Sequence, residues 1–413
     1  MAPQFKAPKG TFDVLGPDSS RYAALVALFA ELAGRYGFEL LVQPMFEDVG
    51  VFQRVGESTD VVRKEMYDFE DKGGRRIALR PEGTAQTARA YLEHHPTPPW
   101  KSWYVGPKFR YDRPQKGRYR QHHEVGVEAI GTADADVDVE VISLACEFYA
   151  ALGLTRITLH LTSLGDGTCR PAYRAELEAY LLERRDQLCD EHRDRITENP
   201  MRVLDCKRDA CVEATKDAPH MIDRLCDDCA THFARVRAGL DAAGIAYEID
   251  PSLVRGLDYY TRTTFEFSTA ALESAQNAAG GGGRYDGLIE QLGGPPTPGI
   301  GFGLGIERIL IACDAEGVFP VPTDRLDVFV IDTTGGDAAR DIARDLRAAG
   351  LRVERAFDNR SFKSQLTAAL RSGARLAVAI EDGGVTLRTL SEKGEPIAVE
   401  RANLVATLTE RLR

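Results

Sequence analysis

The sequence predicts an α+β protein in which an antiparallel sheet, a helical segment and a small α/β domain follow one another. Three observations support this prediction. Residues 103–131 hold two runs of period-two alternation around a polar stretch, which is typical of two antiparallel strands joined by a long loop. Residues 171–243 are charged, helical in period and poor in strand signals. From Leu326 onward, strand and helix patterns alternate, as they do in a compact α/β sandwich.

The first elements are a helix and a short strand. Apolar periodicity predicts a helix over 19–36, and residues 38–42 have the pattern of a strand that ends at Pro44. Further on, Arg-Pro-Glu-Gly-Thr at 80–84 precedes a helical pattern. Glu82 therefore stands just ahead of a helix N-terminus, where a carboxylate stabilises the helix dipole.

The second run of the predicted hairpin has two unlike faces, because alternate side chains of a strand point in opposite directions. One face carries two carboxylates beside a bare glycine, through His122, Glu124, Gly126, Glu128 and Ile130. The other face is apolar apart from His123. The first run ends at Arg110, and the loop over 111–120 is basic. This pattern suits a ligand with phosphates at one end and an ammonium at the other, but an amphipathic hairpin with a solvated tip fits equally well.

Two glycine-rich stretches follow residue 250. Residues 280–287 are predicted to form a turn, and they are no P-loop, because no Gly-Lys-Ser/Thr follows. Over 299–305, glycines alternate with apolar residues, so a strand there has one bare face. A planar base can lie against such a face; close packing against a helix is the alternative. Glu307 and Arg308 then open an apolar helix.

The last part of the chain begins after a proline-containing linker, at Pro320, Pro322 and Asp324. Its expected elements are a strand over 327–331, a helix over 338–349, a strand over 352–354, a helix over 361–372 and a strand over 376–380.

The chain has eight cysteines and no apolar signal core at its N-terminus, which favours reduced thiols or metal ligands over disulfides. Four of them form two close pairs that can supply a tetrahedral zinc site: Cys206, Cys211, Cys226 and Cys229. Buried or surface thiols on two helices are the alternative. Both remain open, so no residue is assigned to a metal.

Length and charge set further bounds. With 413 residues, the chain is long enough for two or three domains. No run of about 18 apolar residues occurs, which predicts a cytoplasmic protein without a membrane span. The formal net charge is −11, but residues 326–413 hold 14 Lys and Arg against 13 Asp and Glu. Because phosphate binding depends on local charge, this nearly neutral tail permits contact with RNA.

Several motifs together resemble the histidyl-tRNA synthetases, a family of class II aminoacyl-tRNA synthetases. FRYDRPQKGRYRQ at 109–121 is similar to motif 2, and RGLDYY at 255–260 is close to a signature of the family. Further likenesses are the Pro-Glu-Gly-Thr turn at 81–84, GGRYDGL at 282–288, a motif 3 pattern over 299–308, a motif 1 pattern over 19–44, and NRSFKSQL at 359–366. These motifs stand in the family's order and span nearly the whole chain.

The resemblance implies a class II catalytic domain that is built on an antiparallel sheet. The catalytic domain would take residues 1–167 and 246–320, with a helical insertion at 168–245 that touches the tRNA acceptor stem, and residues 326–413 would form an anticodon-binding domain. It also implies a homodimer, because motif 1 forms the dimer interface in this family.

The resemblance further implies that ATP, with Mg²⁺ on its phosphates, activates L-histidine to histidyl-adenylate, which passes histidine to the 3′ end of tRNA(His). The implied site residues are Arg110 and Arg255 as catalytic residues; Arg110, Arg118 and Arg308 for ATP; Glu82, Gly83, Thr84, Glu124, Glu128, Tyr259 and Tyr260 for histidine; and Arg113 and Gln115 for the tRNA acceptor end.

One residue departs from the family pattern, since the family usually has Gln where this chain has Glu124. A noncatalytic paralogue, such as the histidine-sensing regulatory subunit of ATP phosphoribosyltransferase, is the alternative reading. Such proteins typically lose the C-terminal domain and part of the ATP arginine set. Here Arg110, Arg255 and Arg308 are all present, and the tail is complete in pattern.

Overall fold

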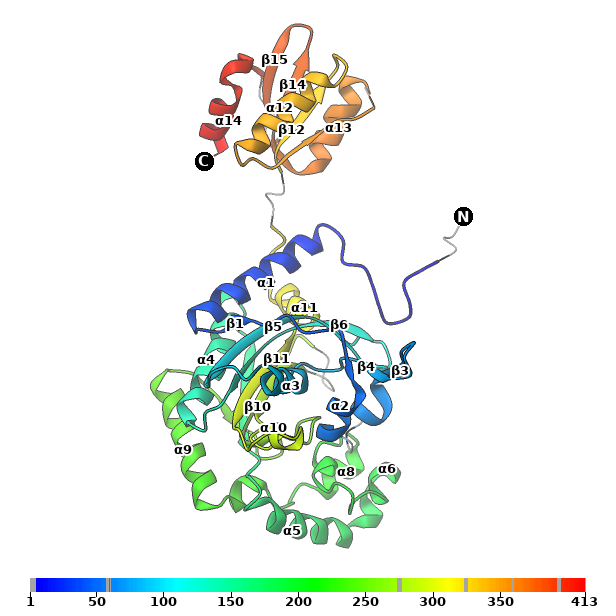
Figure 1. The fold of residues 1–413 in the computed structure, drawn as a ribbon, viewed down its shortest axis with the longest axis vertical. Coiled ribbons are helices and arrows are strands. Elements are labelled where there is room, and N and C mark those ends of the chain that lie inside the picture. The colour runs from blue at the N-terminus through cyan, green and yellow to red at the C-terminus, as the bar shows by residue number, and fades with distance from the viewer. Residues whose placement is uncertain are drawn as a thin grey trace. The chain divides into compact units, whose positions relative to one another are not determined.

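The computed structural model describes residues 5–56, 59, 61–272, 277–322, 326–358, 360–391 and 395–412. Asp324 of the predicted linker and Asn359 of the NRSFKSQL motif lie outside them. The chain divides into two compact units, Met1–Pro320 and Val321–Arg413, each with its own sheet (Figure 1). Among the described residues, no helix is both long and apolar enough to cross a membrane.

The first unit is built on an eight-stranded sheet. In spatial order its strands are β1 (Glu39–Leu40), β5 (Trp100–Phe109), β6 (Gln121–Ile130), β11 (Gly299–Gly305), β10 (Ala278–Arg284), β9 (Thr261–Thr269), β7 (Ile157–Ser163) and β8 (Glu248–Ile249). The six central strands of this order, which begins with β5 and ends with β7, pair with one another in antiparallel fashion. The short edge strands β1 and β8 pair in parallel with β5 and β7. The predicted antiparallel sheet is confirmed.

One face of this sheet carries the main apolar core. Four helices lie on it: α1 (Asp18–Arg35), α4 (Ala135–Ala151), α9 (Asp227–Ala242) and α11 (Ile306–Glu316). Phe29 of α1 and Phe148 of α4 pack there against the buried Val125 and Val127 of β6. The predicted apolar face of the second hairpin run is therefore confirmed, and its carboxylates lie on the other side.

The opposite face is covered by short elements near the N-terminus and by α10 (Figure 1). They are α2 (Val49–Gly56), α3 (Thr84–His94), α10 (Leu288–Gln291) and a three-stranded sheet of β2 (Phe46–Asp48), β4 (Arg76–Leu79) and β3 (Tyr67–Glu70). A second apolar cluster forms here and contains Tyr259, Tyr260 and Tyr285. The expected ligand-binding residues thus gather on this face.

The glycine-rich stretch at 280–287 forms the predicted turn only at 286–287, because residues 278–284 are strand β10. A Cβ atom at Gly282 would lie 1.9 Å from the carbonyl oxygen of Gly301, and one at Gly281 would lie 2.6 Å from that of Phe265. Glycine thus lets β10 fit closely between β9 and β11. The prediction was wrong for residues 280–284, because a glycine run is also what a tightly packed strand requires.

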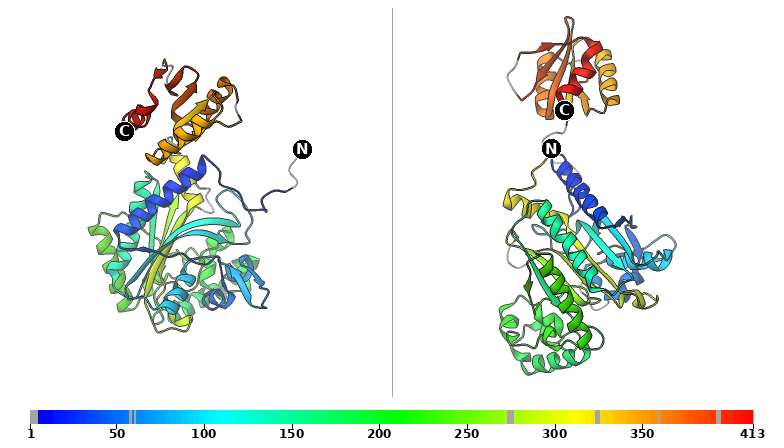
Figure 2. Two further views of the ribbon diagram at one scale, coloured as in Figure 1. Left: turned by 45° about the horizontal axis from the view of Figure 1, so that its top comes forward. Right: turned by 90° about the vertical axis from the view of Figure 1, so that its left-hand side faces the viewer.

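Between β7 and β8 the chain is helical, as predicted. The helices are α5 (Arg170–Glu183), α6 (Asp190–Arg193), α7 (Met201–Leu204), α8 (Asp209–Ala214) and α9. The residues from α5 to α8 form an apolar core of their own, whereas Phe233 and Val236 of α9 belong to the main core. The right-hand view of Figure 2 shows the green α5–α8 group at one end of the first unit.

The second unit is a small α/β sandwich. Its strands, in spatial order, are β13 (Val353–Arg355), β12 (Leu326–Asp332), β14 (Ala374–Glu381), β15 (Gly384–Thr389) and β16 (Ile397–Ala398), and its helices are α12 (Asp337–Ala348), α13 (Phe362–Ser372) and α14 (Leu404–Leu412). The predicted alternation up to β14 is confirmed. The sequence analysis missed β15, β16 and α14.

Candidate active site

The β5–β6 hairpin carries the candidate site on the face opposite the main core. Residues directly across from one another in an antiparallel pair share a face. Tyr104 pairs with Gly126, and Lys108 pairs with His122, so both side chains stand on the face that carries Glu124 and Glu128. This face is therefore richer in polar groups than the alternation in β6 alone predicts.

Glu82 is buried at the start of α3. Its carboxylate accepts hydrogen bonds from the backbone N–H groups of Thr84 at 2.6 Å and Ala85 at 2.9 Å, and from the Tyr259 hydroxyl at 3.3 Å. Burial raises the pKa of Glu82, against the opposing effects of these N–H groups and the Lys108 ammonium. The expected contact with the helix N-terminus is confirmed, and Tyr259 joins it to the second apolar cluster.

Glu128 is completely buried within a ring of hydroxyl groups. Thr84 Oγ1 lies 2.7 Å from its Oε1, Tyr285 Oη lies 2.6 Å from its Oε2, and Tyr104 Oη lies 3.4 Å from its Oε1. Burial raises its pKa to about 8. Near neutral pH, Glu128 is therefore mainly a neutral carboxyl group, which can both donate and accept a hydrogen bond.

The bare face of β11 leaves room for the two carboxylates of β6. A Cβ atom at Gly301 would lie 1.9 Å from Glu128 Oε2, and one at Gly303 would lie 2.7 Å from Glu124 Cδ. The glycine alternation is thus explained by side chains from the neighbouring strand. The sequence analysis had expected a planar ligand or a helix against this face.

Glu124 faces a lysine that the sequence analysis did not single out. Lys108 is 0% exposed, its Nζ lies 3.9 Å from Glu124 Oε1, and it donates to Gln43 Oε1 at 3.4 Å. Burial lowers the pKa of Lys108 to about 8, although Glu124 opposes this shift. The carboxylate that departs from the family pattern therefore has a buried cation beside it.

The remaining predicted histidine-binding residues lie against these carboxylates. Tyr259 and Tyr260 are buried with ring centroids 4.8 Å apart, and Tyr285 lies 6.1 Å from Tyr259. A Cβ atom at Gly83 would lie 2.4 Å from the Tyr104 ring, so glycine is needed at that position. The structure thus brings the predicted histidine-binding set together on one face.

Two of the three predicted ATP-binding arginines, Arg308 and Arg110, are held in place by backbone carbonyl groups. Arg308 Nε donates to Gly117 O at 2.9 Å and its Nη1 to Ala278 O at 2.7 Å, while Arg110 Nε donates to Pro81 O at 2.9 Å. Burial lowers the pKa of Arg308, and the nearby Arg118 and Arg110 lower it further. Three guanidinium groups are thus close enough to repel one another.

Arg118 and Arg255 are each paired with a carboxylate. Arg118 contacts Asp112 and lies 3.8 Å from Glu65, whereas Arg255 contacts Glu266 on β9. Arg255 Nε is buried and has no hydrogen-bond partner among the described residues. Because a buried N–H group without a partner is costly, this donor is available for a ligand.

Arg113 and Gln115 lie on the exposed part of the loop between β5 and β6. Asp112 Oδ1 accepts a hydrogen bond from the Arg113 backbone N–H at 2.7 Å, and Gln115 forms a backbone bridge with Arg118. The structure therefore separates these two residues from the buried histidine-binding set.

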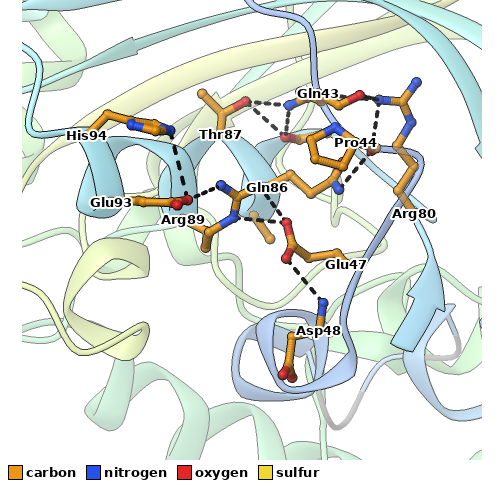
Figure 3. Close-up of polar contacts among 12 residues, drawn as sticks. Gln43, Pro44, Glu47, Asp48, Arg80, Gln86, Thr87, Arg89, Glu93 and His94 are labelled. Atoms are coloured by element: carbon orange, nitrogen blue, oxygen red, sulfur yellow. Dashed lines mark hydrogen bonds and ion pairs between the residues drawn. The ribbon is translucent and has the colours of Figure 1, made fainter. Parts of the chain in front are cut away.

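A polar network fixes the turn that contains Glu82 (Figure 3). Gln43 Nε2 donates to Gly83 O and to Thr87 Oγ1, both at 2.8 Å. Arg80 Nε donates to Pro107 O at 2.7 Å, and Gln86 Nε2 donates to Pro44 O at 3.1 Å. These bonds connect the start of α3 to β5 and to the segment after β1. The position of the turn relative to the sheet is thereby fixed.

The first unit matches the family model for histidyl-tRNA synthetase over residues 10–309, and the second matches the anticodon binding domain over residues 321–411. The chain belongs to the histidyl-tRNA synthetase family. It is 47% identical to the histidine–tRNA ligase of Anaeromyxobacter sp. (strain K) over 95% of this chain and 96% of that one. It is 48% identical to that of Rhodococcus opacus (strain B4) over 98% and 97%.

A solved structure of apo S. aureus histidyl-tRNA synthetase has a TM-score of 0.82 and 34% identity, covering 98% of this chain and all of that one. A Bacillus halodurans structure described as an ATP phosphoribosyltransferase regulatory subunit/histidyl-tRNA synthetase has a TM-score of 0.65, covers 92% of this chain and 99% of that one, and is 21% identical. It shows a shared fold only. The comparisons thus favour the synthetase reading of the sequence over the regulatory one.

Placed within this histidyl-tRNA synthetase fold, the four cysteines at 206, 211, 226 and 229 do not form the single site that their spacing suggested. The first two cluster with Cys189 and His192, and the last two cluster with Asp166 and Cys169. Spacing predicted the two pairs but not their partners, because those partners come from segments that lie elsewhere in the sequence.

Proposed function

We propose that this protein is a histidine–tRNA ligase that activates L-histidine with ATP and transfers it to tRNA(His) in the cytoplasm. One observation carries the proposal. Buried carboxylates, Glu82 and Glu128, lie at one end of the site. At the other end, beside the loop between β5 and β6, the guanidinium groups of Arg110, Arg118 and Arg308 repel one another. An amino acid with its ammonium and ring at the first end would present its carboxylate toward ATP phosphates at the second.

At the phosphate end, Arg110 and Arg255 would hold the reacting histidine carboxylate and the α-phosphate as negative charge develops. Guanidinium suits this role because it is always charged and its donors form a planar fork. Arg118 and Arg308 would hold the outer phosphates. The carbonyl contacts of Arg308 and Arg110 fix both side chains beforehand, so little reorganisation is needed.

Mg²⁺ binding fits the residues at this end. Mg²⁺ usually binds through one or two carboxylates together with substrate phosphates, and it keeps several waters. Glu266 is such a carboxylate, because it contacts Arg255 and is near enough to Arg308 to influence the pKa of that arginine. Bound there, the ion would neutralise phosphate charge.

At the histidine end, Glu82, Thr84 and Glu124 would bind the α-ammonium. Glu128, Tyr259 and Tyr260 would contact the imidazole. A neutral Glu128 carboxyl can match either a donor or an acceptor nitrogen of that ring. Because these polar groups are buried, an amino acid without a polar ring would leave them unpaired, and such mismatches are costly.

Three regions would contact tRNA. Arg113 and Gln115, on the exposed loop, would meet the acceptor end, and the helices within residues 168–245 would lie along the acceptor stem. In the second unit, a hollow of about 780 Å³ is lined by Arg355, Phe357, Lys363 and other residues. Phe357 is 59% exposed and lies under the Arg355 guanidinium, which would allow an anticodon base to stack.

A homodimer would form along the segment that begins at edge strand β1. Four apolar side chains are exposed there within seven residues: Leu40, Val42, Met45 and Phe46. The polar network of Figure 3 holds this segment in place, and a concentration of exposed apolar groups is typical of an interface. Val42→Asp should convert the dimer to a monomer in sedimentation analysis, whereas Val212→Asp, at another exposed valine, should leave it dimeric.

The proposed activity is tested by histidine-dependent exchange between ATP and pyrophosphate, followed by charging of tRNA(His). A ligase performs both. A histidine-sensing regulatory protein would bind histidine in calorimetry but support neither reaction, and that result would refute the proposal. Exchange without charging would limit the proposal to adenylate formation.

A further inference from the structure

Six of the eight cysteines lie in two clusters near the helices of residues 168–245. We call Cys189, His192, Cys206 and Cys211 the α6–α8 cluster, and Asp166, Cys169, Cys226 and Cys229 the stem cluster. In each cluster, one ligand atom from every residue lies within 4.8 Å of the other three. We propose that each cluster binds one structural Zn²⁺ ion.

The distances in the α6–α8 cluster lie close to those of a tetrahedral site. Ligand atoms about 2.0–2.3 Å from zinc stand about 3.3–3.8 Å apart at the tetrahedral angle. His192 Nδ1 lies 3.1 Å from Cys189 Sγ and 3.9 Å from Cys211 Sγ. The backbone N–H of Cys189 also donates to Cys211 Sγ at 3.3 Å. Hydrogen bonds of this kind support metal-bound ligands.

The α6–α8 cluster is placed where the fold has little else to hold it. Helices α6 and α7 have four residues each, and α8 has six. Such short helices are not stable on their own, and the apolar core they share with α5 is small. One ion bound by Cys189, Cys206 and Cys211 would join all three helices. Structural zinc contributes directly to the folding of such small units.

The stem cluster has the same geometry with a carboxylate in place of the imidazole. Cys169 Sγ lies 3.9 Å from Cys229 Sγ, and Asp166 Oδ1 lies 3.7 Å from Cys169 Sγ and 3.8 Å from Cys226 Sγ. Oδ1 also accepts a hydrogen bond from the Thr168 backbone N–H. Asp166 Oδ2 pairs with Arg262 Nη2 at 3.3 Å. The carboxylate thus turns one oxygen to the thiols, as a zinc ligand would.

The stem cluster joins the two chain segments that lead into and out of the helical segment. Asp166 and Cys169 precede α5, whereas Cys226 and Cys229 begin α9, about 60 residues later. A metal that closes so long a loop restricts the unfolded chain strongly. A single ion fits better than an iron–sulfur cluster, because the ligand atoms of a cluster must stand farther apart to enclose several irons.

The stem cluster also adjoins the candidate active site. Arg262, the partner of Asp166, follows Tyr259 and Tyr260 in the chain, and Arg170 Nη1 donates to Tyr260 O at 2.9 Å. Zinc at the stem would therefore fix the end of the loop that presents these tyrosines. The α6–α8 cluster reaches the same loop through α7, where Arg202 Nη2 donates to Gly256 O at 2.8 Å.

Elemental analysis of the full-length protein, purified with zinc and without chelators, tests the proposal. We expect two zinc ions per chain. Cys206→Ser and Cys226→Ser should each leave one, and Cys146→Ser, at a partly buried cysteine outside both clusters, should leave two. Replacing zinc with Co²⁺ in the wild-type protein should give the visible absorption of tetrahedral, thiolate-bound cobalt, which decides the matter even if a variant fails to fold.

Each other outcome counts against a site. Zinc that Cys226→Ser does not reduce would refute the stem site, and zinc that Cys206→Ser does not reduce would refute the α6–α8 site. A metal-free wild-type protein that takes up neither Zn²⁺ nor Co²⁺, or one that holds iron or disulfides at these cysteines, would refute both. These readouts do not depend on ligase activity, so they can fail independently of the proposed function.

Discussion

The histidine end and the phosphate end of the candidate site treat charge in opposite ways. Glu82 and Glu128 are buried among hydroxyl and N–H donors, and burial raises the pKa of both. At the phosphate end, the side chains of Arg118 and Arg255 are 33% and 18% exposed, and neighbouring arginines lower the pKa of Arg308. Burial thus favours the neutral form of both carboxyl groups at the acidic end. At the basic end, Arg118 and Arg255 have carboxylate partners, but Arg308 lies among arginines that repel it.

This difference implies a division of labour. Groups that are already satisfied in the free protein provide shape and specificity, because only a matching ligand can replace their bonds. Groups whose repulsion is relieved by an anion provide stabilisation as negative charge builds up in the transition state. Substitutions at the two ends should therefore affect different kinetic constants, and the effects should be largest at the phosphate end.

The largest effect is expected for Arg255→Ala. Removing one preorganised donor to developing negative charge typically lowers kcat by about 10²–10³-fold. We expect this loss in histidine-dependent pyrophosphate exchange, with histidine binding changed much less. Arg156→Ala, at an exposed arginine, is the control and should exchange normally. Near-normal exchange by folded Arg255→Ala protein would show that this arginine does not act at the reacting carboxylate.

Arg113→Ala should separate the two steps of the reaction. The side chain is exposed on the loop beyond the buried residues, so adenylate formation should be unchanged. Losing one charge-assisted hydrogen bond to an RNA phosphate should reduce kcat/KM for tRNA about tenfold. The reduction should be smaller at high salt, because salt screens the contact in the wild-type protein as well. Pyrophosphate exchange and aminoacylation are measured on the same preparation. An equal loss in both assays would place Arg113 in the ATP site instead.

Much of this arrangement could be predicted from sequence, because strand alternation fixes which side chains share a face. That rule placed Glu124 and Glu128 together and Val125 on the core side. Applied to residues 100–110 as well, it would have placed Tyr104 and Lys108 beside them. Lys108 was missed because a lysine in a strand usually marks the solvent side, and here it is 0% exposed.

Other features depend on contacts that no local pattern encodes. Tyr285 donates a hydrogen bond to Glu128. The sequence analysis missed this role because it assigned the tyrosine and the glycine run before it to a turn. Each cysteine cluster requires two separate segments to meet, and spacing identifies only neighbours within one segment. Strand β15 and helix α14 were missed because their short patterns are weak on their own.

Glu128→Gln should make stability less dependent on pH. The pKa of Glu128 is about 8 in the folded protein, against an ordinary value of 4.5. As pH rises between these values, the unfolded chain gains a charge that the folded chain resists, so wild-type stability falls. Glutamine does not ionise, so the variant lacks this fall in stability. Its melting temperature relative to wild type should therefore be a few degrees higher at pH 8 than at pH 5, and a constant difference would contradict the neutral carboxyl group.

The smallest effect is expected for Glu124→Gln, the change that restores the residue usual in the family. Glu124 holds up the pKa of Lys108, which burial lowers to about 8. Removing the Glu124 carboxylate should lower the pKa of Lys108 further. At pH 8 the site then loses one negative charge at residue 124 and one positive charge at Lys108, so its net charge hardly changes. An amide oxygen can still accept from the α-ammonium, so activity should stay within about twofold.

Glu124→Ala has no acceptor, so it should raise KM for histidine about tenfold and leave KM for ATP nearly unchanged. Steady-state kinetics on both variants, with Glu290→Ala at an exposed glutamate as control, measure these constants. An unchanged histidine KM in Glu124→Ala would mean that the carboxylate serves Lys108 alone.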